Sequence, residues 1–378
     1  MSKPIISVTV DSFLPRWDGV SRALVEWLPR MTQWYDFRVI VPDYGPGRPK
    51  FDGVQYHLFP LLPWIRIEGA GLPIYRASNI ERALAGTDIL WTHSIAGLAG
   101  KVASIAKRHS IPVISMVHSV EWEVYARNLP VGRELFERLW LLECRRRYRG
   151  STRMITPSQA TADILRDANF EHQISVVPLG VDTERFSVPT IEERAEFKTS
   201  LGFKPESFVF GYLGRFGAEK NLPLLFKAFE QLQRPDTGLL VVGGEPATFD
   251  TIQTSQEIRI FGSTSVPEDF YRAMDAFVLP SWSESAPLSI LEAMSCGVVP
   301  LSTPVGNVPT YLDETLGFLF SPSSVDDLAT KMSRLLSESD HLATRQERVR
   351  TFVEDNFDWD TSAQAIHAIF NDVLSASG

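Results

Sequence analysis

The sequence predicts two doubly wound α/β domains, and three observations lead to this class. First, 378 residues are too many for one hydrophobic core and suit two domains of roughly 180 residues each. Second, short runs of β-branched and other apolar residues alternate with longer amphipathic segments, in both halves of the chain. Third, most of these runs are apolar throughout, as in parallel strands that helices cover on both faces.

The expected strands and helices alternate along the chain. In the first half the strands are expected at Ile5–Val10, Phe37–Val41, Asp88–Trp91, Pro112–Val117, Arg153–Ile155 and Ile174–Val177. In the second half they are expected at Phe208–Leu213, Gly238–Val242, Ile258–Phe261, Ala276–Leu279 and Val298–Leu301. Helices are expected between them, for example at Gly19–Trp34, Ala96–His109, Ser158–Ala168, Leu222–Leu232 and Ser324–Leu336.

A stretch rich in turn-forming residues, 178–204, separates the two halves. We therefore expect an N-terminal domain over residues 1–185 and a second domain over residues 186–356. The remaining segment, residues 357–378, contains a last expected helix at Trp359–Leu374. Its apolar residues share one helical face, which must pack on another element.

Composition and charge exclude several classes of protein. No apolar run approaches the roughly 20 residues of a membrane helix, and the first residues resemble a strand more than a signal peptide. Cys144 and Cys296 have the spacing of neither a disulfide framework nor a zinc site, which fits the cytoplasm. Residues 1–180 carry 22 lysines and arginines against 17 acidic residues, and residues 181–378 carry 15 against 29. The basic half suggests an anionic partner, with drift in surface charge as the alternative. Nucleic acid is not expected, because the basic patch is small and no reader motif is present.

The strongest chemical signal is SESAPLSILEAMSCGVVPLSTPVG, residues 283–306. Pro287 stands where a helix could begin, and Gly297 where it could end. Glu284 is therefore expected in a loop, and Glu292 inside the helix. The first amides of that helix would be free to bind an anion, and both carboxylates could accept hydrogen bonds from hydroxyl groups. On spacing alone, an ordinary surface helix explains the pattern at least as well.

A second signal is GYLGRFGAEKNLPLLFKAF, residues 211–229. A strand ends in a glycine turn at Gly214, two cations follow at Arg215 and Lys220, and a helix begins directly afterwards. Cations and a helix N-terminus together could hold a diphosphate and stabilise negative charge on it as it departs. Two solvated surface charges are the alternative.

Two further features lie at expected strand ends in the first half. Asp18 and Gly19 follow the first strand, and glycine permits a ligand to approach the backbone closely. The motif G-x-G-x-x-G is missing, so a nicotinamide dinucleotide is not indicated. His118 directly follows an apolar strand, at the edge where ligands of doubly wound sheets bind. Glu121 and Glu123 are weaker candidates nearby, and a purely structural histidine is the alternative.

Two segments of the basic half could meet a membrane surface. Residues 57–75 are apolar and rich in proline and are expected to form a loop. Residues 134–150 have the pattern of an amphipathic helix that ends in arginines. Apolar side chains could insert into the membrane beside these cations. The candidate contacts are Trp64, Arg66, Arg145, Arg146 and Arg147. Alternatively, both segments pack within the first domain, since a helix C-terminus itself favours arginines.

Taken together, these motifs resemble the GT-B glycosyltransferases, specifically the large retaining group-one family that includes glycogen synthases, sucrose synthases and bacterial mannosyltransferases. The segments that carry the resemblance are DSFLPRWDGVSR, MVHSVEWE, ITPSQATADIL, VVPLGVDTERF, YLGRFGAEKNLPLL and PSWSESAPLSILEAMSCGVVPLSTPVG. The last contains the E-x7-E signature of that family. The resemblance implies two Rossmann-like domains with the active site in the cleft between them. It also implies that residues 357–378 cross back to the first domain as a helix.

The resemblance also implies site residues. The catalytic set is Arg215, Lys220, Glu284 and His118, and the donor-binding set is Gly19, Gly214, Arg215, Lys220, Glu284, Ala286, Pro287, Leu288 and Glu292. Arg215 and Lys220 would neutralise the donor diphosphate, and Glu292 would hold the ribose hydroxyls. Glu284 and the neighbouring backbone amides would hold the transferred sugar, which His118 would contact from the other domain.

The implied activity is transfer of a hexose, with retention, from a UDP- or GDP-linked sugar to an acceptor hydroxyl. No obligatory metal is expected. The basic half and a weaker likeness to glycolipid-forming members favour a lipid acceptor and an enzyme peripheral on the cytoplasmic membrane face. The alternatives are a soluble transferase for polysaccharides or small molecules, a sugar-nucleotide epimerase, and a non-catalytic sugar-nucleotide sensor. Departures from the common family pattern at Asp18, Ser119 and residues 285–287 leave the identity of the sugar open.

Overall fold

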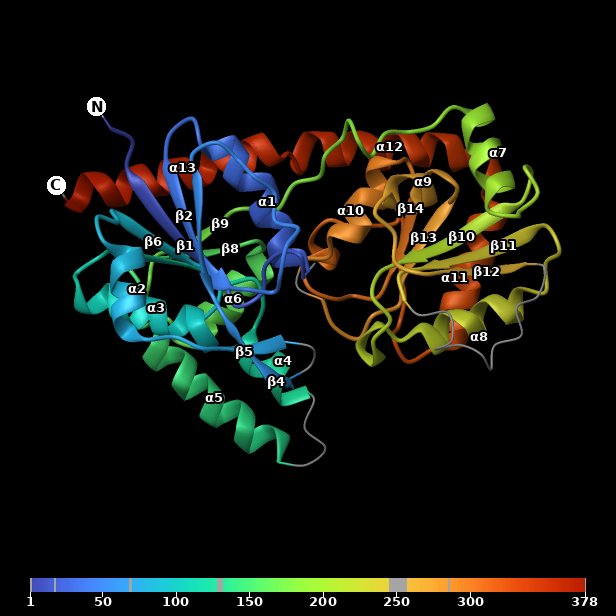
Figure 1. Ribbon diagram of the computed structural model, residues 1–378. Coiled ribbons are helices and arrows are strands. Elements are labelled where there is room, and N and C mark those ends of the chain that lie inside the picture. The colour runs from blue at the N-terminus through green and yellow to red at the C-terminus, as the bar shows by residue number, and fades with distance from the viewer. Residues whose placement is uncertain are drawn as a thin grey trace. The chain divides into compact units, whose positions relative to one another are not determined.

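The computed structural model describes residues 2–16, 18–67, 70–127, 132–244, 257–284 and 286–377. The chain divides into two compact units (Figure 1). Unit 1 consists of Met1–Leu179 together with Trp359–Gly378, and unit 2 consists of Gly180–Asp358. The divisions thus fall after residues 179 and 358, where the sequence suggested 185 and 356.

Unit 1 is built on a parallel sheet with the strand order β3-β2-β1-β6-β7-β8-β9. Its strands are β1 Ile5–Thr9, β2 Asp36–Pro42, β3 Val54–Phe59, β6 Ile89–Thr92, β7 Val113–Met116, β8 Arg153–Thr156 and β9 Ile174–Val176. The central strand β1 pairs with β2 on one side and with β6 on the other. β6 and β7 are buried along their whole length, as their continuous apolar sequence predicts.

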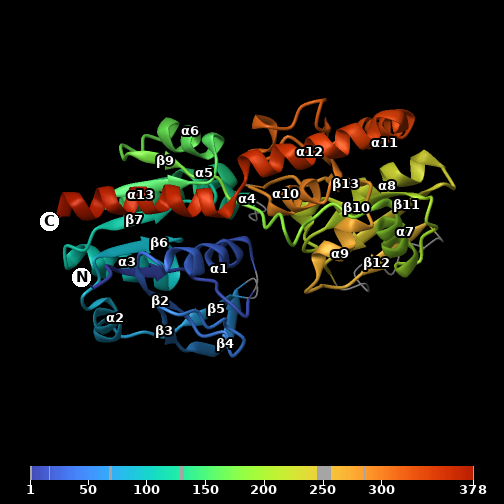
Figure 2. The same ribbon diagram turned by 90° about the horizontal axis from the view of Figure 1, so that it is seen from above.

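Helices cover both faces of this sheet, with α1 and α13 on one side and α2 and α3 on the other (Figures 1 and 2). Neighbouring residues of β6 face opposite sides, because Trp91 contacts Phe370 of α13 whereas Leu90 packs among residues of α2 and α3. The helices are α1 Gly19–Met31, α2 Ala77–Leu84, α3 Gly97–Arg108, α4 Glu121–Arg127, α5 Arg133–Tyr148, α6 Gln159–Asp167 and α13 Trp359–Ser377.

The last helix, α13, is held to α1 by a buried aromatic contact. Trp27 of α1 is fully buried, and its ring meets that of Trp359 edge to face with centroids 5.6 Å apart. The Trp27 indole N–H donates to the Ser362 hydroxyl at 2.9 Å. At the margin of this contact, Arg30 forms an ion pair with Asp360 at 2.9 Å. The two ends of the chain therefore complete one core.

The expectation that residues 57–75 form a loop is wrong. β3 includes the first residues of this segment, and β4 Leu61–Ile67 pairs antiparallel with β5 Ala70–Pro73. Prolines suggested a loop, but a two-stranded ribbon has only edge strands, where a missing amide donor is tolerated. The two strands pack closely, since a Cβ on Gly71 would lie 2.6 Å from the Leu61 side chain.

Unit 2 contains a second parallel sheet, with the order β12-β11-β10-β13-β14-β15. Its strands are β10 Phe208–Leu213, β11 Thr237–Val242, β12 Ile258–Phe261, β13 Ala276–Leu279, β14 Val299–Ser302 and β15 Phe318–Leu319. Its helices are α7 Ile191–Ser200, α8 Leu222–Leu232, α9 Pro267–Arg272, α10 Leu288–Ser295, α11 Val325–Ser337 and α12 Leu342–Asn356, with a short 3-10 turn η1 at Ala218–Lys220. Residues of α8 and α11 form one core with the sheet, and residues of α9, α10 and α12 form another.

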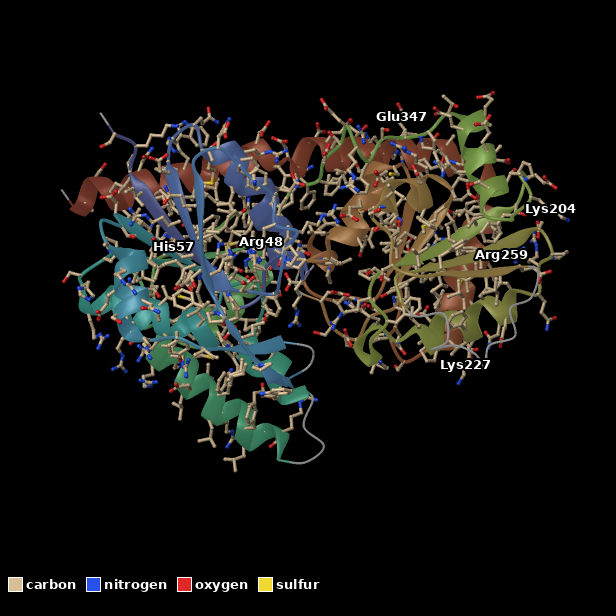
Figure 3. The ribbon with its side chains drawn as sticks, viewed as in Figure 1. Arg48, His57, Lys204, Lys227, Arg259 and Glu347 are labelled. Carbon is tan, nitrogen blue, oxygen red and sulfur yellow. The ribbon has the colours of Figure 1, made fainter. Side chains whose placement is uncertain are left out.

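Charged side chains lie on the outside of unit 2 (Figure 3). Lys204 and Lys227 are exposed to solvent. Arg259 instead serves the fold, because its guanidinium donates to the Gly202 carbonyl at 2.9 Å and lies over the Phe203 ring. Exposed cations without such a role provide matched controls for the experiments below.

The chain enters and leaves unit 2 along two adjacent segments. The Val181 amide donates to the Phe357 carbonyl at 2.9 Å, and Val181 forms a parallel bridge with Asp358. Unit 2 is a continuous segment of the sequence, and it is inserted between the two stretches that make unit 1.

The order of the strands reverses at one point in each sheet. The chain moves from β1 to β2 in one direction and later places β6 on the other side of β1; in unit 2, β11 and β13 flank β10 in the same way. Ligands of doubly wound sheets bind beyond the carboxyl ends of the strands at such a point. A ligand is therefore expected at the loops after β1 and β6 in unit 1, and at those after β10 and β13 in unit 2.

Candidate functional site

In unit 2, the loops that follow β10 and β13 are in direct contact. The Trp282 amide donates to the Glu219 carbonyl at 2.8 Å, so the two loops share a backbone hydrogen bond. Both loops contain residues that the sequence predicts for a donor site. Their strands pair in parallel, which brings the carboxyl ends together at the switch point of the sheet.

Lys220 and Glu284 form an ion pair across these loops. The Lys220 ammonium lies 2.7 Å from Glu284 Oε1, and the Ser281 hydroxyl donates to the same oxygen at 2.8 Å. The two side chains are only 17% and 14% exposed, so their attraction is screened less than that of a surface pair. A bound diphosphate could replace Glu284 as the partner of Lys220. The carboxylate would then be free to accept hydrogen bonds from a sugar hydroxyl.

Arg215 lies at the open side of the same loop. Its side chain is 79% exposed and pairs with Glu219 at 2.9 Å, four residues along the chain. An exposed pair of this kind contributes only about 0–1 kcal/mol, so the guanidinium can leave it at small cost to meet a ligand.

Gly214 lies where the ends of β10 and β11 approach closely. A Cβ on Gly214 would lie 2.8 Å from the Tyr212 hydroxyl, and one on Gly243 would lie 2.3 Å from the Gly214 carbonyl oxygen. A side chain at Gly243 would push the strand ends apart, whereas one at Gly214 would meet the Tyr212 side chain of β10. The close approach of the two strand ends therefore requires glycine at Gly243, whereas a side chain at Gly214 would have to displace the Tyr212 hydroxyl.

Two helices, α8 and α10, begin at this switch point without a side-chain cap. Elsewhere in unit 2, Thr190 caps α7 and Ser324 caps α11, whereas α9 and α12 also begin without a side-chain cap. Asn221 precedes α8, but its side chain donates instead to the Pro322 carbonyl at 2.9 Å. Uncapped amides and the positive ends of two helix dipoles favour an anion here.

The expected group of amides at the start of α10 needs one correction. Ala286 and Leu288 carry N–H groups, but Pro287 has no amide hydrogen and cannot donate a hydrogen bond. Pro287 is the residue that precedes the helix, which begins at Leu288 and ends before Gly297 in the left-handed conformation. The sequence-based start and end of this helix therefore agree with the structure.

Glu292 lies deeper than the other candidates. It is 2% exposed, and it accepts a hydrogen bond from the buried Tyr271 hydroxyl at 3.0 Å. Lys220 and Glu284 thus meet directly, Arg215 lies beside them at the surface, and Glu292 lies within α10. Contact of Glu292 with a ribose requires access to this buried position.

In unit 1, His118 forms a hydrogen-bonded pair with His93. Nδ1 of His93 lies 2.8 Å from Nε2 of His118, and the rings stack with centroids 5.1 Å apart. Burial lowers the pKa of His118 to about 4 and also lowers the pKa of His93, so both rings are neutral near pH 7. Sequence reasoning missed His93, although it follows β6 directly, just as His118 closely follows β7.

Gly19 is the first residue of α1. Asp18 caps this helix by accepting a hydrogen bond from the Ser21 amide at 2.8 Å. A Cβ on Gly19 would meet nothing within 4 Å, so the space above it is open. Packing therefore does not require glycine here, and the open space suits the approach of a ligand.

Glu121, a weaker candidate from the sequence, is partly buried and interacts electrostatically with Asp11. Burial, and then the charge of Asp11, raise the pKa of Glu121 to about 7. Burial also raises the pKa of Asp11, which accepts hydrogen bonds from the Ala99 amide and the Ser94 hydroxyl. Asp11 thereby fixes the start of α3, whereas Glu121 accepts from the Tyr148 hydroxyl at 3.4 Å.

We expect Glu121→Gln to flatten the dependence of stability on pH. Between the unperturbed pKa of 4.5 and the folded pKa of about 7, the folded state binds the extra proton, so stability falls as the pH rises through this window. The thermal midpoint of the wild type should drop between pH 5 and pH 8 by about 4 °C more than that of the variant. Differential scanning fluorimetry measures both drops. Glu134→Gln, at an exposed carboxylate of α5, should behave like the wild type, and equal drops in all three proteins would contradict the expectation.

The candidate membrane contacts divide into separate groups. Trp64 is 90% exposed on β4, and the side chain of Arg66 lies outside the described residues. Arg145 donates to the Ala168 carbonyl at 2.8 Å, and Arg147 donates to the Ile95 carbonyl at 2.6 Å. These two arginines hold α5 to its own unit, which corrects the expectation that they face a membrane. Arg146 is 69% exposed and pairs with Glu143 on the same helix.

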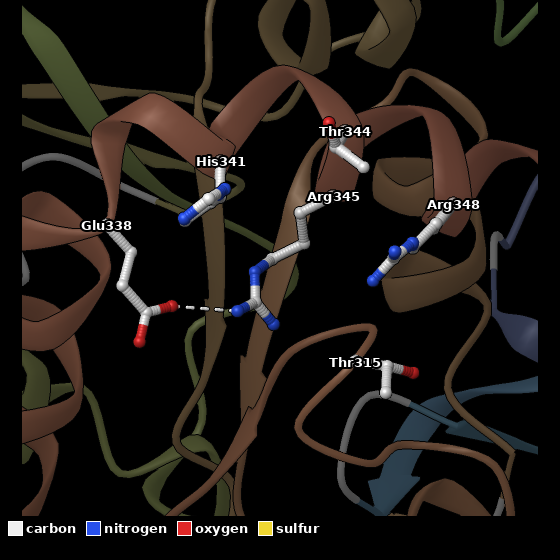
Figure 4. A pocket seen from close by; sticks show the side chains of 6 residues that line it. All are labelled: Thr315, Glu338, His341, Thr344, Arg345 and Arg348. Atoms are coloured by element: carbon white, nitrogen blue, oxygen red, sulfur yellow. Dashed lines mark hydrogen bonds and ion pairs between the residues drawn. The ribbon is translucent and has the colours of Figure 1, made fainter.

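Two pockets lie away from the predicted donor residues. One, of about 280 Å³, lies in unit 2 around α12, where Arg345 pairs with Glu338 at 2.8 Å (Figure 4). The other, of about 400 Å³, lies in unit 1 between the paired strands β4 and β5 and the start of α3; its lining residues are Leu62, Leu72, Pro73, Ile74, Tyr75 and Gly97. The pocket around α12 is lined by polar and charged residues, none of which is a predicted site residue. The pocket in unit 1 is lined mostly by apolar residues.

Two family descriptions match the chain. Residues 193–372 match Glycosyl transferases group 1, and residues 17–185 match Glycosyltransferase Family 4. Among curated relatives, the sulfoquinovosyl transferase SQD2 of Arabidopsis thaliana is 27% identical over 72% of this chain and 54% of its own length, so the chain spans about half of that protein. The UDP-Gal:alpha-D-GlcNAc-diphosphoundecaprenol alpha-1,3-galactosyltransferase of Escherichia coli is 27% identical over 88% of both chains.

Solved structures share the fold over almost the whole chain. The sucrose-phosphate synthase of Thermosynechococcus elongatus has a TM-score of 0.81 at 16% identity, covering 99% of this chain and 100% of its own. The Anabaena protein Alr3699/HepE, in complex with UDP-glucose, has a TM-score of 0.78 at 17% identity, covering 97% and 99%.

The described residues contain neither a membrane-spanning helix nor a cluster of metal ligands. Within those residues, no helix has the length and apolarity needed to cross a membrane. In the same part of the chain, no group of histidine, cysteine or acidic side chains is arranged to hold a metal ion. Two parallel-sheet units, their switch-point loops and the two matching family descriptions lead to one assignment: the chain belongs to the group 1 glycosyltransferases and has the GT-B fold.

Proposed function

We propose that this protein transfers a sugar from a nucleoside diphosphate sugar to an acceptor hydroxyl, with retention at the anomeric carbon. The observation that carries the proposal is the Lys220–Glu284 pair, which lies where two uncapped helices begin at the switch point of unit 2. One cation and two helix N-termini suit a diphosphate, and the carboxylate beside them suits sugar hydroxyls. The names of the relatives support a sugar-transfer reaction.

Most of the predicted donor-site residues have a role in this proposal. Lys220 and Arg215 bind the diphosphate, Arg215 from its exposed position and Lys220 after it leaves Glu284. The amides of Ala286 and Leu288 assist them. Glu284 then accepts hydrogen bonds from the transferred sugar, while Glu292 holds the ribose hydroxyls. In unit 1, Gly19 leaves open space for the ligand, and neutral His118 donates or accepts a hydrogen bond at the sugar.

Retention follows from attack on the face that the diphosphate leaves. The bond between the anomeric carbon and the phosphate oxygen breaks, and the acceptor oxygen forms its bond on the same face. The acceptor proton passes to the departing phosphate oxygen. Lys220, Arg215 and the helix N-termini stabilise the negative charge that develops on this group.

Ligand-induced stabilisation tests the donor part of the proposal. A UDP- or GDP-linked sugar should raise the thermal midpoint, because a ligand at about 100 times its Kd stabilises the folded state by about 2.7 kcal/mol. UMP and GMP are the matched controls, since they lack the second phosphate and should give smaller shifts. HepE was solved with UDP-glucose, which makes UDP sugars the first to test. If no nucleotide sugar shifts the midpoint, the proposed donor site is wrong.

The acceptor that we propose is a membrane lipid, and the enzyme would work as a peripheral protein on the cytoplasmic membrane face. The E. coli relative is named for a diphosphoundecaprenol-linked acceptor, which supports this choice. Transfer of a labelled sugar into a butanol-extractable product tests it, and NMR of that product reports the anomeric configuration. Product from water-soluble acceptors alone would indicate a soluble transferase. A changed sugar nucleotide without any acceptor would indicate an epimerase, and binding without turnover would indicate a sensor.

A further inference from the structure

Helix α5 exposes apolar residues that nothing in unit 1 covers among the described residues. Leu135, Leu139 and Leu142 are 65%, 58% and 59% exposed, and their spacing places them on one face of the helix. The opposite face contributes Cys144 and Tyr148 to the core of unit 1. The helix is therefore anchored on one side and presents a row of leucines to solvent on the other.

Arginines share the exposed face with these leucines. Arg138, Arg146 and Arg149 are exposed and follow Leu135 by three, eleven and fourteen residues, so they belong to the same side of the helix. Arg145 and Arg147 point away, since they bond to backbone carbonyls of unit 1. The face is not purely cationic: Glu134 is exposed at the start of the helix, and Glu143 pairs with Arg146.

We propose that this face of α5 docks on an anionic lipid bilayer, with the three leucines in the interface and the arginines at the level of the phosphate groups. A helix in the membrane plane needs an apolar row flanked by long cationic side chains, which can keep their charges in water. Charge complementarity with anionic headgroups favours a bilayer, because most of the exposed charges beside the leucines are arginines. The inference rests on the proposed lipid acceptor, and it adds the surface that brings unit 1 to that lipid.

Vesicle flotation with matched double variants tests the surface. The probes are vesicles of phosphatidylcholine alone and of equal parts of phosphatidylcholine and phosphatidylglycerol. Leu139→Ser with Leu142→Ser removes apolar side chains, and Ile191→Ser with Val266→Ser is the control at exposed apolar residues of unit 2. Arg138→Gln with Arg149→Gln removes charge, and Lys204→Gln with Lys227→Gln is its control.

We expect the wild type and both controls to float with the anionic vesicles and to bind neutral ones weakly. Each α5 double variant should bind about 10-fold more weakly, and added salt should weaken the wild type more than the arginine variant. The exposed position of all these side chains predicts unchanged thermal midpoints, which fluorimetry checks. No binding by the wild type, or full binding by the α5 variants, would overturn the proposal. The proposal would also be overturned if light scattering showed that the wild type is a dimer and that the leucine substitutions make it a monomer.

The outcome is separable from that of the proposed function. Transfer to an acceptor dissolved in detergent micelles does not require docking on a bilayer. If the α5 variants keep this transfer and lose flotation, the docking surface is supported. If wild-type transfer is present and flotation is absent, the docking surface fails and the enzyme assignment stands.

Discussion

Lys220→Ala is expected to lower turnover with a nucleotide sugar on the order of 100-fold or more. The substitution removes a cation that, in the proposed reaction, faces the departing diphosphate. It also leaves Glu284, 14% exposed, without the partner that lies 2.7 Å away. The loss should fall mainly on kcat, because charge on the phosphate develops in the transition state.

Steady-state kinetics of Lys220→Ala and Lys227→Ala separate a specific effect from general damage. Lys227 is an exposed lysine of α8, and its replacement should leave turnover unchanged. A double-mutant cycle with Glu284→Gln then isolates the energy of the pair from the effect of an unpaired carboxylate. Turnover of Lys220→Ala close to the wild type would remove Lys220 from the mechanism.

Trp27→Ala is expected to destabilise unit 1 by about 3–5 kcal/mol, the usual range for an aromatic residue lost from a core. Trp27 is fully buried, meets Trp359 edge to face and donates to the Ser362 hydroxyl. Alanine leaves a cavity between α1 and α13 and removes the hydrogen bond that the Ser362 hydroxyl accepts, although this hydroxyl still donates to the Pro178 carbonyl. The long segment of unit 2 separates α13 from the rest of unit 1 in the sequence, so tertiary contacts such as this one hold the helix in place. Loss of the contact should therefore also loosen α13.

Chemical denaturation and hydrogen exchange of α13 measure the effect of Trp27→Ala. Trp64→Ala is the matched control, because it also removes a tryptophan side chain, but one that is 90% exposed. This substitution should change the free energy of unfolding little. Unfolding of the two variants at the same denaturant concentration would show that the Trp27 contact is not what holds α13.

Much of the fold could be predicted from the sequence because its strands are buried on both faces. Runs such as Phe208–Leu213 and Ala276–Leu279 are apolar throughout, and the structure has strands with these same bounds. Start and stop residues were equally informative for α10, where Pro287 precedes the helix and Gly297 follows it. The GT-B class agrees with the solved structures that share this architecture.

Other features depend on tertiary contacts that local pattern does not encode. Lys220 and Glu284 are 64 residues apart, and their pairing follows from the neighbouring positions of β10 and β13 in the sheet. On α5, successive residues differ by about 100° around the axis, so Arg146 faces solvent while Arg145 and Arg147 bond to unit 1. The pairing of β4 with β5 cannot be predicted from the prolines of this segment, because proline is typical of loops and is also tolerated in edge strands.

The continuity of unit 2 has a consequence for biosynthesis. All of Gly180–Asp358 leaves the ribosome before Trp359, so unit 2 can complete its core while unit 1 still lacks α13. Until α13 has been synthesised, Trp27 has no Trp359 or Ser362 to cover it. The half of the protein that is synthesised first is therefore expected to reach its native packing last.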